Sequence, residues 1–233
     1  MIRVVAATGS TNADLLVAVR SGAVEGSWLR AERQTGGRGR ADRLWASPPG
    51  NLYASTVVRL RGGDPAAPGL ALVAGVALQE VAAAYVAGPQ LRLKWPNDLL
   101  VGDAKLAGIL LEREGDAVVI GFGVNLVRHP VDAGRPATDL AALSGSAPDP
   151  DSFMLDLSAT LARWLGRWRS DGLAPVRRRW LERAHPVGSA IATTGPLGRI
   201  EGLFDGLEPD GALRLRQAHG DVQIVRAGDV HLI

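Results

Sequence analysis

The chain has 233 residues, of which 46% are hydrophobic and 21% charged, and its formal net charge at pH 7 is +2. This length and composition suit a globular domain with a small appendage, and so slight a charge is not typical of a nucleic-acid-binding protein. The chain has no cysteine, which excludes disulfides, thiolate metal sites and a cysteine nucleophile. No signal sequence and no membrane-spanning apolar run is recognisable, so we expect a cytoplasmic protein with no membrane partner.

The first third of the chain contains patterns for two helices and two strands. Ser10 and Thr11 are hydroxyl residues that favour a helix N-terminus, and the apolar residues after them recur with helical spacing until Gly22. Further on, β-forming runs and a long alanine-rich stretch follow. In chain order, we predict a helix at 12–22, a strand at 27–32, a strand at 51–60 and a helix at 68–86.

The rest of the chain changes from sheet to helix and back to sheet. The segments LRLKW, AGILLE and AVVIGFGVNL all have β character, and two helices are predicted at residues 152–169 and 174–184. From Pro186 onward, frequent glycine and alternating apolar residues predict four or five short strands. We therefore predict an α+β fold with a mixed, mainly antiparallel sheet flanked by helices over residues 1–185, and a small β-barrel-like domain over residues 186–233.

Only two of the 26 basic residues are lysines, Lys94 and Lys105, and both lie in the stretch KWPNDLLVGDAKLAGILLE. A lysine supplies a compact charge with rotatable donors, which a planar guanidinium does not replace. WPND and VGDAK are turn-forming sequences between β-forming runs, and a hairpin at Gly102 and Asp103 brings Asp98 close to Lys105. We therefore predict a carboxylate and an ammonium beside one pocket, as in a phosphoryl or acyl transfer site.

Two glycine-containing motifs accompany this hairpin. In QTGGRGRADR, residues 34–43, three glycines let backbone amides approach an anion, and Arg38 and Arg40 supply forked donors for phosphate or carboxylate. GFGVNL, residues 121–126, ends an apolar strand where a flat ligand has room, and Asn125 offers an amide to a base edge. Taken alone, the first motif is more often a mobile surface loop than an anion site, and the second is also explained by close packing of the backbone against a neighbouring element.

The order of the motifs STN, QTGGRGR, W-x-S-P, KWPND, K-L-A-G-I-L-x-E and G-x-G-x-N resembles the catalytic domain of biotin protein ligases. These enzymes join biotin to a lysine of biotin-dependent carboxylases through biotinyl-AMP. The resemblance covers about residues 8–140, and residues 186–233 are similar to the family's small C-terminal β domain. It implies the class II synthetase and biotin–lipoate ligase fold, biotin and ATP as substrates with Mg²⁺, and a biotin carboxyl carrier protein domain as partner.

The resemblance also implies the site residues. The biotin-binding residues are Ser10, Thr11, Asn12, Gln34, Gly37, Arg38, Gly39, Arg40, Trp45, Lys105, Gly108, Ile109, Leu110, Gly121 and Gly123. The nucleotide-binding residues are Arg38, Arg40, Trp45, Asn97, Lys105 and Asn125. The catalytic residues are Lys105, Arg38 and Arg40, which neutralise the phosphate, and Asp98 is the candidate Mg²⁺ ligand.

Many bacterial members begin with a DNA-binding domain that represses biotin synthesis. Because the STN motif lies within a dozen residues of the start, we expect a ligase without repressor activity and with no DNA partner. The sequence does not fix the oligomeric state, and a weak or ligand-dependent homodimer is one expectation.

Two alternative functions remain open. A lipoate or octanoate ligase has the same general fold, but KWPND counts against lipoate, and the lack of cysteine counts against cysteine-dependent acyl transferases. A non-catalytic nucleotide- or RNA-binding module would need a broad basic face with stacking aromatic residues. Here 24 acidic residues nearly balance 26 basic ones, which counts against such a module.

Overall fold

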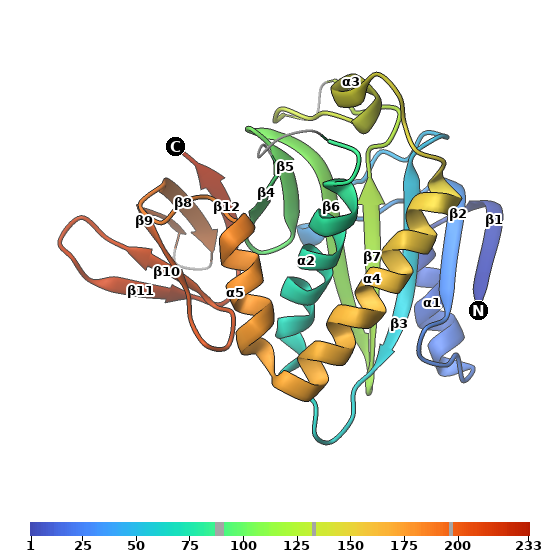
Figure 1. The fold of residues 1–233 in the computed structure, drawn as a ribbon, viewed down its shortest axis with the longest axis horizontal. Coiled ribbons are helices and arrows are strands. Elements are labelled where there is room, and N and C mark those ends of the chain that lie inside the picture. Colours follow the sequence, from blue (N-terminus) through green and yellow to red (C-terminus); the bar gives the residue numbers. More distant parts are fainter. Residues whose placement is uncertain (87–90, 132–133, 196–197) are drawn as a thin grey trace.

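The structure is a computed structural model that describes residues 1–86, 91–131, 134–195 and 198–233. It contains two sheets, one of seven strands and one of five (Figure 1). The strands of the first are β1 (Ile2–Thr8), β2 (Trp28–Gln34), β3 (Leu52–Arg59), β4 (Leu91–Lys94), β5 (Asp98–Val101), β6 (Ala104–Glu114) and β7 (Ala117–Val124). The strands of the second are β8 (Ala190–Gly195), β9 (Gly198–Leu207), β10 (Leu213–Arg216), β11 (Val222–Val225) and β12 (Asp229–Leu232).

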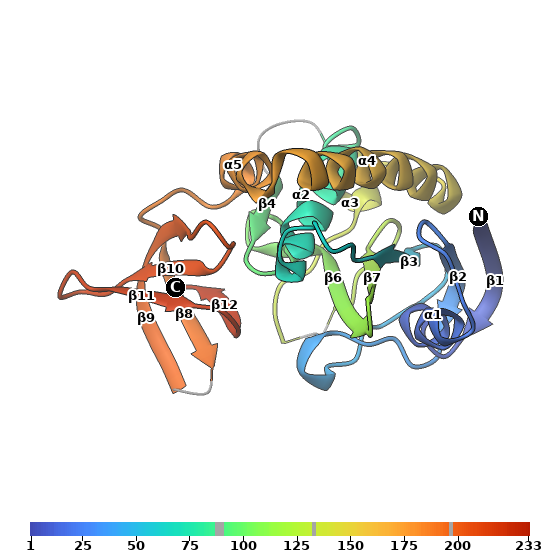
Figure 2. The ribbon, with the colours of Figure 1, turned by 90° about the horizontal axis from the view of Figure 1, so that it is seen from below.

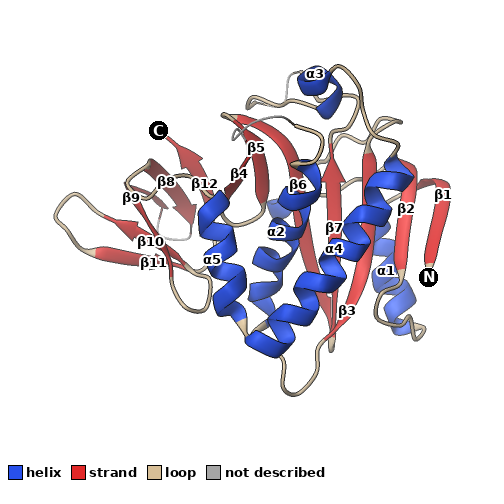
Figure 3. Cartoon of the chain, viewed as in Figure 1, coloured by secondary structure: helices blue, strands red, loops and turns tan. Residues whose placement is uncertain are grey.

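The seven-stranded sheet has the order β1-β2-β3-β7-β6-β5-β4, and the five-stranded sheet has the order β11-β10-β9-β8-β12. Strands β1 and β2 are parallel, whereas the other paired strands are antiparallel. The prediction of an α+β fold with a mixed, mainly antiparallel sheet and a small C-terminal β region is therefore confirmed (Figure 3). The helices are α1 (Thr11–Arg20), α2 (Leu70–Ala82), α3 (Leu140–Ser144), α4 (Pro150–Asp171) and α5 (Leu173–Arg183), with short 3-10 turns η1 (Arg40–Asp42) and η2 (Ala67–Gly69).

The two faces of the seven-stranded sheet are covered by different helices, and only one face carries the site. Helices α2, α4 and α5 cover one face, whereas α1 lies on the other (Figure 2). Helix α2 is apolar on nearly every side because it packs against the sheet and is covered in turn by α4 and α5. This explains its strong apolar pattern in the sequence, and the main core of the protein lies here.

Helix α1 begins where the sequence predicts. The Ser10 side chain accepts a hydrogen bond from the backbone N–H of Ala13, which is the arrangement of a helix N-cap. The apolar face of α1 forms a second, smaller core in which Leu15 and Val19 pack with Leu29 of β2 and residues of β3 and β7. This packing fixes the first turn of α1 above the sheet, and that turn carries predicted site residues.

Strand β1 was not predicted. Its seven residues are exposed or only partly buried, so its sequence shows no apolar and polar alternation. The strand forms because it pairs in parallel with β2, from Ile2 opposite Trp28 to Thr8 opposite Gln34. Such a pairing is set by a distant part of the chain, which local sequence patterns do not reveal.

The five-stranded sheet is joined to the larger sheet by side-chain contacts of two adjacent residues where β4 ends and the β4–β5 turn begins. Trp95 Nε1 donates to Gly211 O at 3.1 Å, and Lys94 Nζ donates to Val230 O at 2.9 Å. The predicted domain boundary at residues 185 and 186 falls in the connection between α5 and β8. Across the described ranges, no helix is both long and apolar enough to cross a membrane.

Candidate active site

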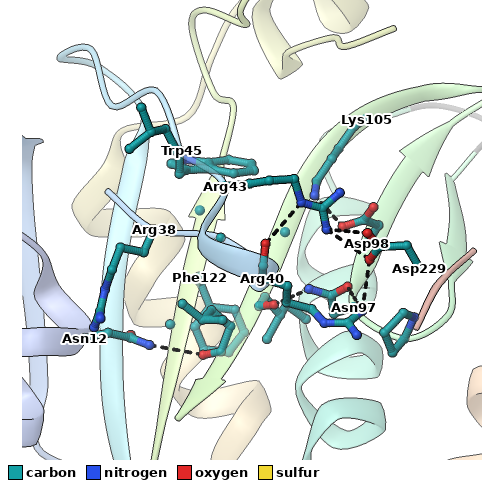
Figure 4. A pocket seen from close by; sticks show the side chains of 18 of the residues that line it. Asn12, Arg38, Arg40, Arg43, Trp45, Asn97, Asp98, Lys105, Phe122 and Asp229 are labelled. Atoms are coloured by element: carbon teal, nitrogen blue, oxygen red, sulfur yellow. Dashed lines mark hydrogen bonds and ion pairs between the residues drawn. The ribbon is translucent and has the colours of Figure 1, made fainter. Parts of the chain in front are cut away.

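A cavity lies on the α1 face of the seven-stranded sheet, between β6, β7, the glycine–arginine loop and β12 (Figure 4). It gathers predicted residues from five separate parts of the chain. The predicted site residues that line it are Ser10, Thr11, Asn12, Gln34, Arg38, Gly39, Arg40, Trp45, Asn97, Asp98, Lys105, Gly108, Ile109, Leu110, Gly121 and Gly123. Lining residues that were not predicted as site residues include Arg43, Lys94, Phe122, Arg135, Asp229 and His231.

Two predicted site residues, Gly37 and Asn125, do not line the cavity. Asn125 is 2% exposed, and its Nδ2 donates to Thr138 O at 3.0 Å and to Lys105 O at 3.5 Å. Its Nδ2 thus links the backbone at Lys105 to the backbone at Thr138, and its predicted contact with a base stays a prediction. A Cβ at Gly37 would lie 2.5 Å from Trp45 O, so this glycine is needed for the loop to close on itself.

One end of the cavity, here called the cationic end, consists of Lys94, Asp98, Lys105 and Arg135. The hairpin of β5 and β6 places Lys105 Nζ in a very short hydrogen bond with Asp98 Oδ1, as the sequence predicts. Asp98 Oδ2 contacts Arg135 Nη1 at 3.1 Å and Lys94 Nζ at 3.2 Å. Three cations therefore surround one carboxylate, which leaves a local excess of positive charge in a largely buried place.

The same contacts shift the pKa values of the buried pair. Burial opposes ionisation of Asp98, but the charges of Lys105, Lys94 and Arg135 outweigh it and lower the pKa of this carboxyl to about 2. For Lys105, burial is the largest cause and lowers the pKa of the ammonium from 10.5 to about 8, against the attraction of Asp98. Asp98 is thus an anion and Lys105 is a cation at neutral pH.

The structure does not support Asp98 as a Mg²⁺ ligand. Both of its oxygens already face cations, and its side chain is only 7% exposed. A divalent ion at this carboxylate would stand beside three positive groups, which repel it. In the part of the chain that the structure describes, no three His, Cys, Asp or Glu side chains are grouped to hold a metal ion. The sequence showed the carboxylate, but it did not show that the three cations converge on it.

The glycine–arginine loop folds into a small hairpin. Gly39 N donates to Arg43 O at 2.7 Å, and Trp45 N donates to Gly37 O at 2.9 Å. At its tip, Arg40 Nη2 donates to Gly228 O at 3.0 Å, and Arg43 Nη2 lies 2.8 Å from Asp229 Oδ2. The carboxylate of β12 thus holds the arginine tip of the loop at the mouth of the cavity.

Arg38 and Arg40 point to opposite ends of the cavity, although the sequence led us to expect both at the phosphate. Arg38 lies beside Asn12 and forms an ion pair with Glu112 at 3.0 Å, whereas Arg40 lies toward Asn97 and Asp229 (Figure 4). The difference arises because the backbone turns into η1 at Arg40, so the two side chains do not share a face. Arg38 therefore lies at the end where it was also predicted to contact biotin, Arg40 lies toward the end expected to hold phosphate, and both roles stay predictions.

The other end of the cavity, here called the neutral end, consists of Ser10, Thr11, Asn12 and Gln34. The first three side chains are no more than 6% exposed. Thr11 N donates to Gln34 Oε1 at 2.9 Å, and Asn12 Nδ2 donates to Glu112 Oε2 at 2.8 Å. Amides and hydroxyls that face a buried cavity suit an uncharged ligand group with several hydrogen-bonding atoms.

Glycines on β6 and β7 make room between the two ends. A Cβ at Gly121 would overlap the Asn12 amide, and a Cβ at Gly123 would lie 2.5 Å from the Trp45 ring. The Trp45 ring in turn lies near Lys105, whose Nζ is 5.2 Å from the ring centroid. In this structure the strand glycines thus accommodate the side chains of the cavity wall.

The cavity combines the two kinds of site that an acid-activating ligase needs, a neutral end for an organic group and a cationic end for phosphate. The family model of the biotin/lipoate A/B protein ligase family matches residues 5–125. The chain is 39% identical over 238 residues to biotin--[acetyl-CoA-carboxylase] ligase of Paracoccus denitrificans, covering 97% of this chain and 98% of the relative. It is 37% identical over 233 residues to the ligase of the same name from Mycobacterium tuberculosis, covering 97% and 87%.

Among solved structures, the chain is similar to biotin protein ligase from Aquifex aeolicus in complex with biotin and ATP. The TM-score is 0.89 at 24% sequence identity, and the match covers 100% of this chain and 99% of that structure. This chain belongs to the biotin/lipoate A/B protein ligase family.

Proposed function

We propose that the protein activates biotin with ATP to form biotinyl-5'-AMP and then transfers the biotinyl group to a lysine of a biotin carboxyl carrier domain. The observation that carries this proposal is one cavity that joins a buried neutral end to a cationic end. The neutral end suits the uncharged ureido ring of biotin, and the cationic end suits the phosphates of ATP. Two relatives that share 37% and 39% of their residues with this chain bear the name of this activity.

In the first step, a carboxylate oxygen of biotin attacks the α-phosphorus of ATP and pyrophosphate leaves. Two unit anions at about 4 Å repel by about 1 kcal/mol in water and by about 4 kcal/mol at an effective dielectric constant of 20. The ammonium of Lys105 and the guanidinium of Arg40 are placed to offset this repulsion. Their donors are held by Asp98 and by Gly228 O before the reaction begins, so little reorganisation is required.

In the second step, a neutral lysine amine of the carrier domain attacks the acyl carbon of the mixed anhydride, and AMP leaves. The anhydride is prone to hydrolysis, so water must be kept away until the carrier arrives. The hairpin of residues 37–45 lies over the cavity, and it is fastened to β12 through Arg43 and Asp229. We infer that this loop shields the adenylate.

The neutral end also favours biotin over the rival acids. A dithiolane ring or a simple alkyl chain could not use the hydrogen-bonding atoms that Thr11 and Gln34 present on the cavity wall, and a site built for hydrogen bonding rejects such ligands. An RNA-binding face is not favoured either. Arginines in both regions of the protein are paired with acids, as in the contacts of Arg169 of α4 with Glu25 and of Arg214 of β10 with Asp205.

The test is biotin-dependent exchange of labelled pyrophosphate into ATP by the purified protein, with lipoate and octanoate in parallel. We expect exchange with biotin alone, followed by biotin transfer when a carrier domain is added. Exchange with lipoate or octanoate, or with none of the acids, would contradict the proposal. A weak homodimer and a cytoplasmic location stay predictions.

A further inference from the structure

A ring of hydrogen bonds runs behind the neutral end of the cavity and begins and ends on the glycine–arginine loop. It includes three residues, Ser47, Ser55 of β3 and Glu112 of β6, that are not on the cavity wall. In order, the linked groups are the side chains of Arg38, Glu112, Asn12, Ser55 and Thr11, then, through the backbone N–H of Thr11, the side chains of Gln34 and Ser47 and the carbonyl of Trp45. Because each hydroxyl has only one proton, the direction of every bond in this ring is constrained.

The direction is fixed first at Asn12. Its Nδ2 lies 2.8 Å from Glu112 Oε2 and 3.3 Å from Leu110 O, and both of these oxygens accept hydrogen bonds. A carboxylate that also takes a hydrogen bond from Arg38 is acceptor-only. The amide of Asn12 must therefore point its nitrogen at Glu112 and its oxygen at Ser55.

The constraint then passes through two hydroxyls. Ser55 Oγ lies 2.6 Å from Asn12 Oδ1, which has no proton, so Ser55 is the donor in this bond. Ser55 Oγ also lies 2.7 Å from Thr11 Oγ1, and since its own proton is already donated, Thr11 must donate to it. The Thr11 hydroxyl also lies 3.1 Å from Gln34 Oε1, but one proton does not serve both contacts, and Ser55 is nearer.

This leaves Thr11 Oγ1 and Gln34 Oε1 as neighbouring oxygens on the cavity wall, both with lone pairs to offer. Gln34 Oε1 already accepts from Thr11 N at 2.9 Å, which keeps the amide in this orientation. A ligand N–H placed here meets acceptors, whereas a ligand oxygen or sulfur meets lone pairs without a proton between them.

We propose that Ser55 is a positioning residue that determines specificity by holding the Thr11 hydroxyl as an acceptor toward the ligand. Ser55 is 0% exposed and is not on the cavity wall, so it acts through Thr11. The site then selects acids whose ring presents an N–H at this point over acids of the same shape that present oxygen. This inference rests on the proposed function, since the ureido ring of biotin carries two such N–H groups.

The experiment uses two analogues of biotin in which one or the other ureido N–H is replaced by a ring oxygen. The ratio of kcat/KM for pyrophosphate exchange, biotin over analogue, is measured for the unaltered protein, Ser55→Ala and Thr56→Ala. Thr56 is the matched control because it is also a buried hydroxyl on β3, but it donates to Ser27 O at 3.0 Å, away from the ring. For the unaltered protein we expect a ratio of about ten or more with the analogue whose oxygen faces Thr11.

In Ser55→Ala the Thr11 proton is released and can turn to the ring oxygen, so we expect this ratio to fall about fivefold or more. The ratio for the other analogue, and both ratios in Thr56→Ala, should not change. Unchanged ratios for both analogues in Ser55→Ala would overturn the proposal while leaving the proposed function intact. No exchange with biotin by the unaltered protein would instead overturn the proposed function itself.

A second variant keeps the test decisive if Ser55→Ala does not fold. Ser55→Cys retains a side chain of similar size but has only a weak S–H donor. In this variant we expect the ratio of kcat/KM for biotin over the analogue whose oxygen faces Thr11 to fall as well. If the ratio of kcat/KM for biotin over this analogue were the same in Ser55→Cys as in the unaltered protein, the proposal would be contradicted. Discrimination would then not depend on the strength of this hydrogen bond.

Discussion

The neutral and cationic ends of the cavity are both buried and polar, but different forces organise them. At the neutral end, Thr11, Asn12 and Gln34 are linked by bonds between uncharged groups, and the direction of each proton decides what the wall offers. At the cationic end, Lys94, Lys105 and Arg135 crowd around Asp98, and the excess of charge decides what binds. Changes at the cationic end should therefore cost more than changes at the neutral end.

The largest effect is expected for Asp98→Asn. This change leaves three cations close together without their buried counter-charge, and we expect the free energy of unfolding to fall by about 3–5 kcal/mol. Urea unfolding would measure it, with Asp103→Asn as the control, because Asp103 lies in the same hairpin but is exposed. Equal losses in the two variants would show that the ion cluster does not stabilise the fold.

Because the pKa of Asp98 is lowered, its contribution to the free energy of unfolding should depend on pH in the acid range. The pKa is about 2 in the folded protein against 3.8 for the ordinary group, so the folded state favours the anion. Its stabilisation is complete above the unfolded value and is lost as the pH falls toward 2. We expect the free energy of unfolding to fall less in Asp98→Asn than in the unaltered protein between pH 4 and about 2. Parallel curves of this free energy against pH would contradict a lowered pKa of Asp98.

Replacement of Lys105 should affect catalysis most. We expect Lys105→Ala to lower the rate of pyrophosphate exchange by about 10²–10³-fold, as for the loss of one preorganised donor. Lys105→Arg should fail as well, because Nζ is held between Asp98 and the Trp45 ring, and a planar guanidinium does not reproduce the compact charge of the ammonium there. Arg92→Ala, on β4 but outside the cavity lining, is the control. Near-normal exchange in Lys105→Arg would mean that charge alone suffices.

A smaller effect is expected at the edge of the cationic end, where Asp229 holds Arg43 and contacts Arg40. We expect Asp229→Ala to raise the KM for ATP about fivefold, equivalent to roughly 1 kcal/mol, and to leave the KM for biotin nearly unchanged. Asp221→Ala is the control, since its side chain is 81% exposed and lies in the same C-terminal region. Tighter ATP binding in Asp229→Ala would instead show that this carboxylate competes with phosphate for the arginines.

The smallest expected effect is a difference in pH dependence between ATP use at the cationic end and biotin binding at the neutral end. The Lys105 ammonium has a pKa of about 8, and the protonated form is the one that stabilises phosphate, so kcat/KM for ATP should be halved near pH 8 and fall further above it. The equilibrium affinity for biotin alone should stay flat from pH 7 to about 9, because neutral groups bind the ring. A parallel decline of both quantities would remove the distinction between the ends.

The sequence predicts those parts of the site that local chemistry determines. Ser10 is a helix cap because a hydroxyl precedes an amphipathic run, and the Asp98–Lys105 contact follows from a turn between two β-forming segments. These features depend on a few neighbouring residues, so their prediction requires no knowledge of the fold. The order of the motifs then identified the family.

The sequence does not predict contacts that the fold brings together from distant parts. Arg135 reaches Asp98 because the backbone of residues 136–138 pairs with Lys105, and Asp229 reaches the loop from a different sheet. Neither residue lies in a recognisable motif. Asn125 shows the converse case, in which a motif residue predicted to meet a nucleotide donates to the backbone at Thr138.

The place of β12 in the chain has a consequence for protein synthesis. Every other segment that lines the cavity precedes β12 in the sequence, and β12 supplies the groups that hold Arg40, Arg43 and Lys94. A nascent chain on the ribosome therefore contains the residues of both ends before it contains the strand that fastens the arginine loop. The mouth of the cavity is completed only when this last strand has been made.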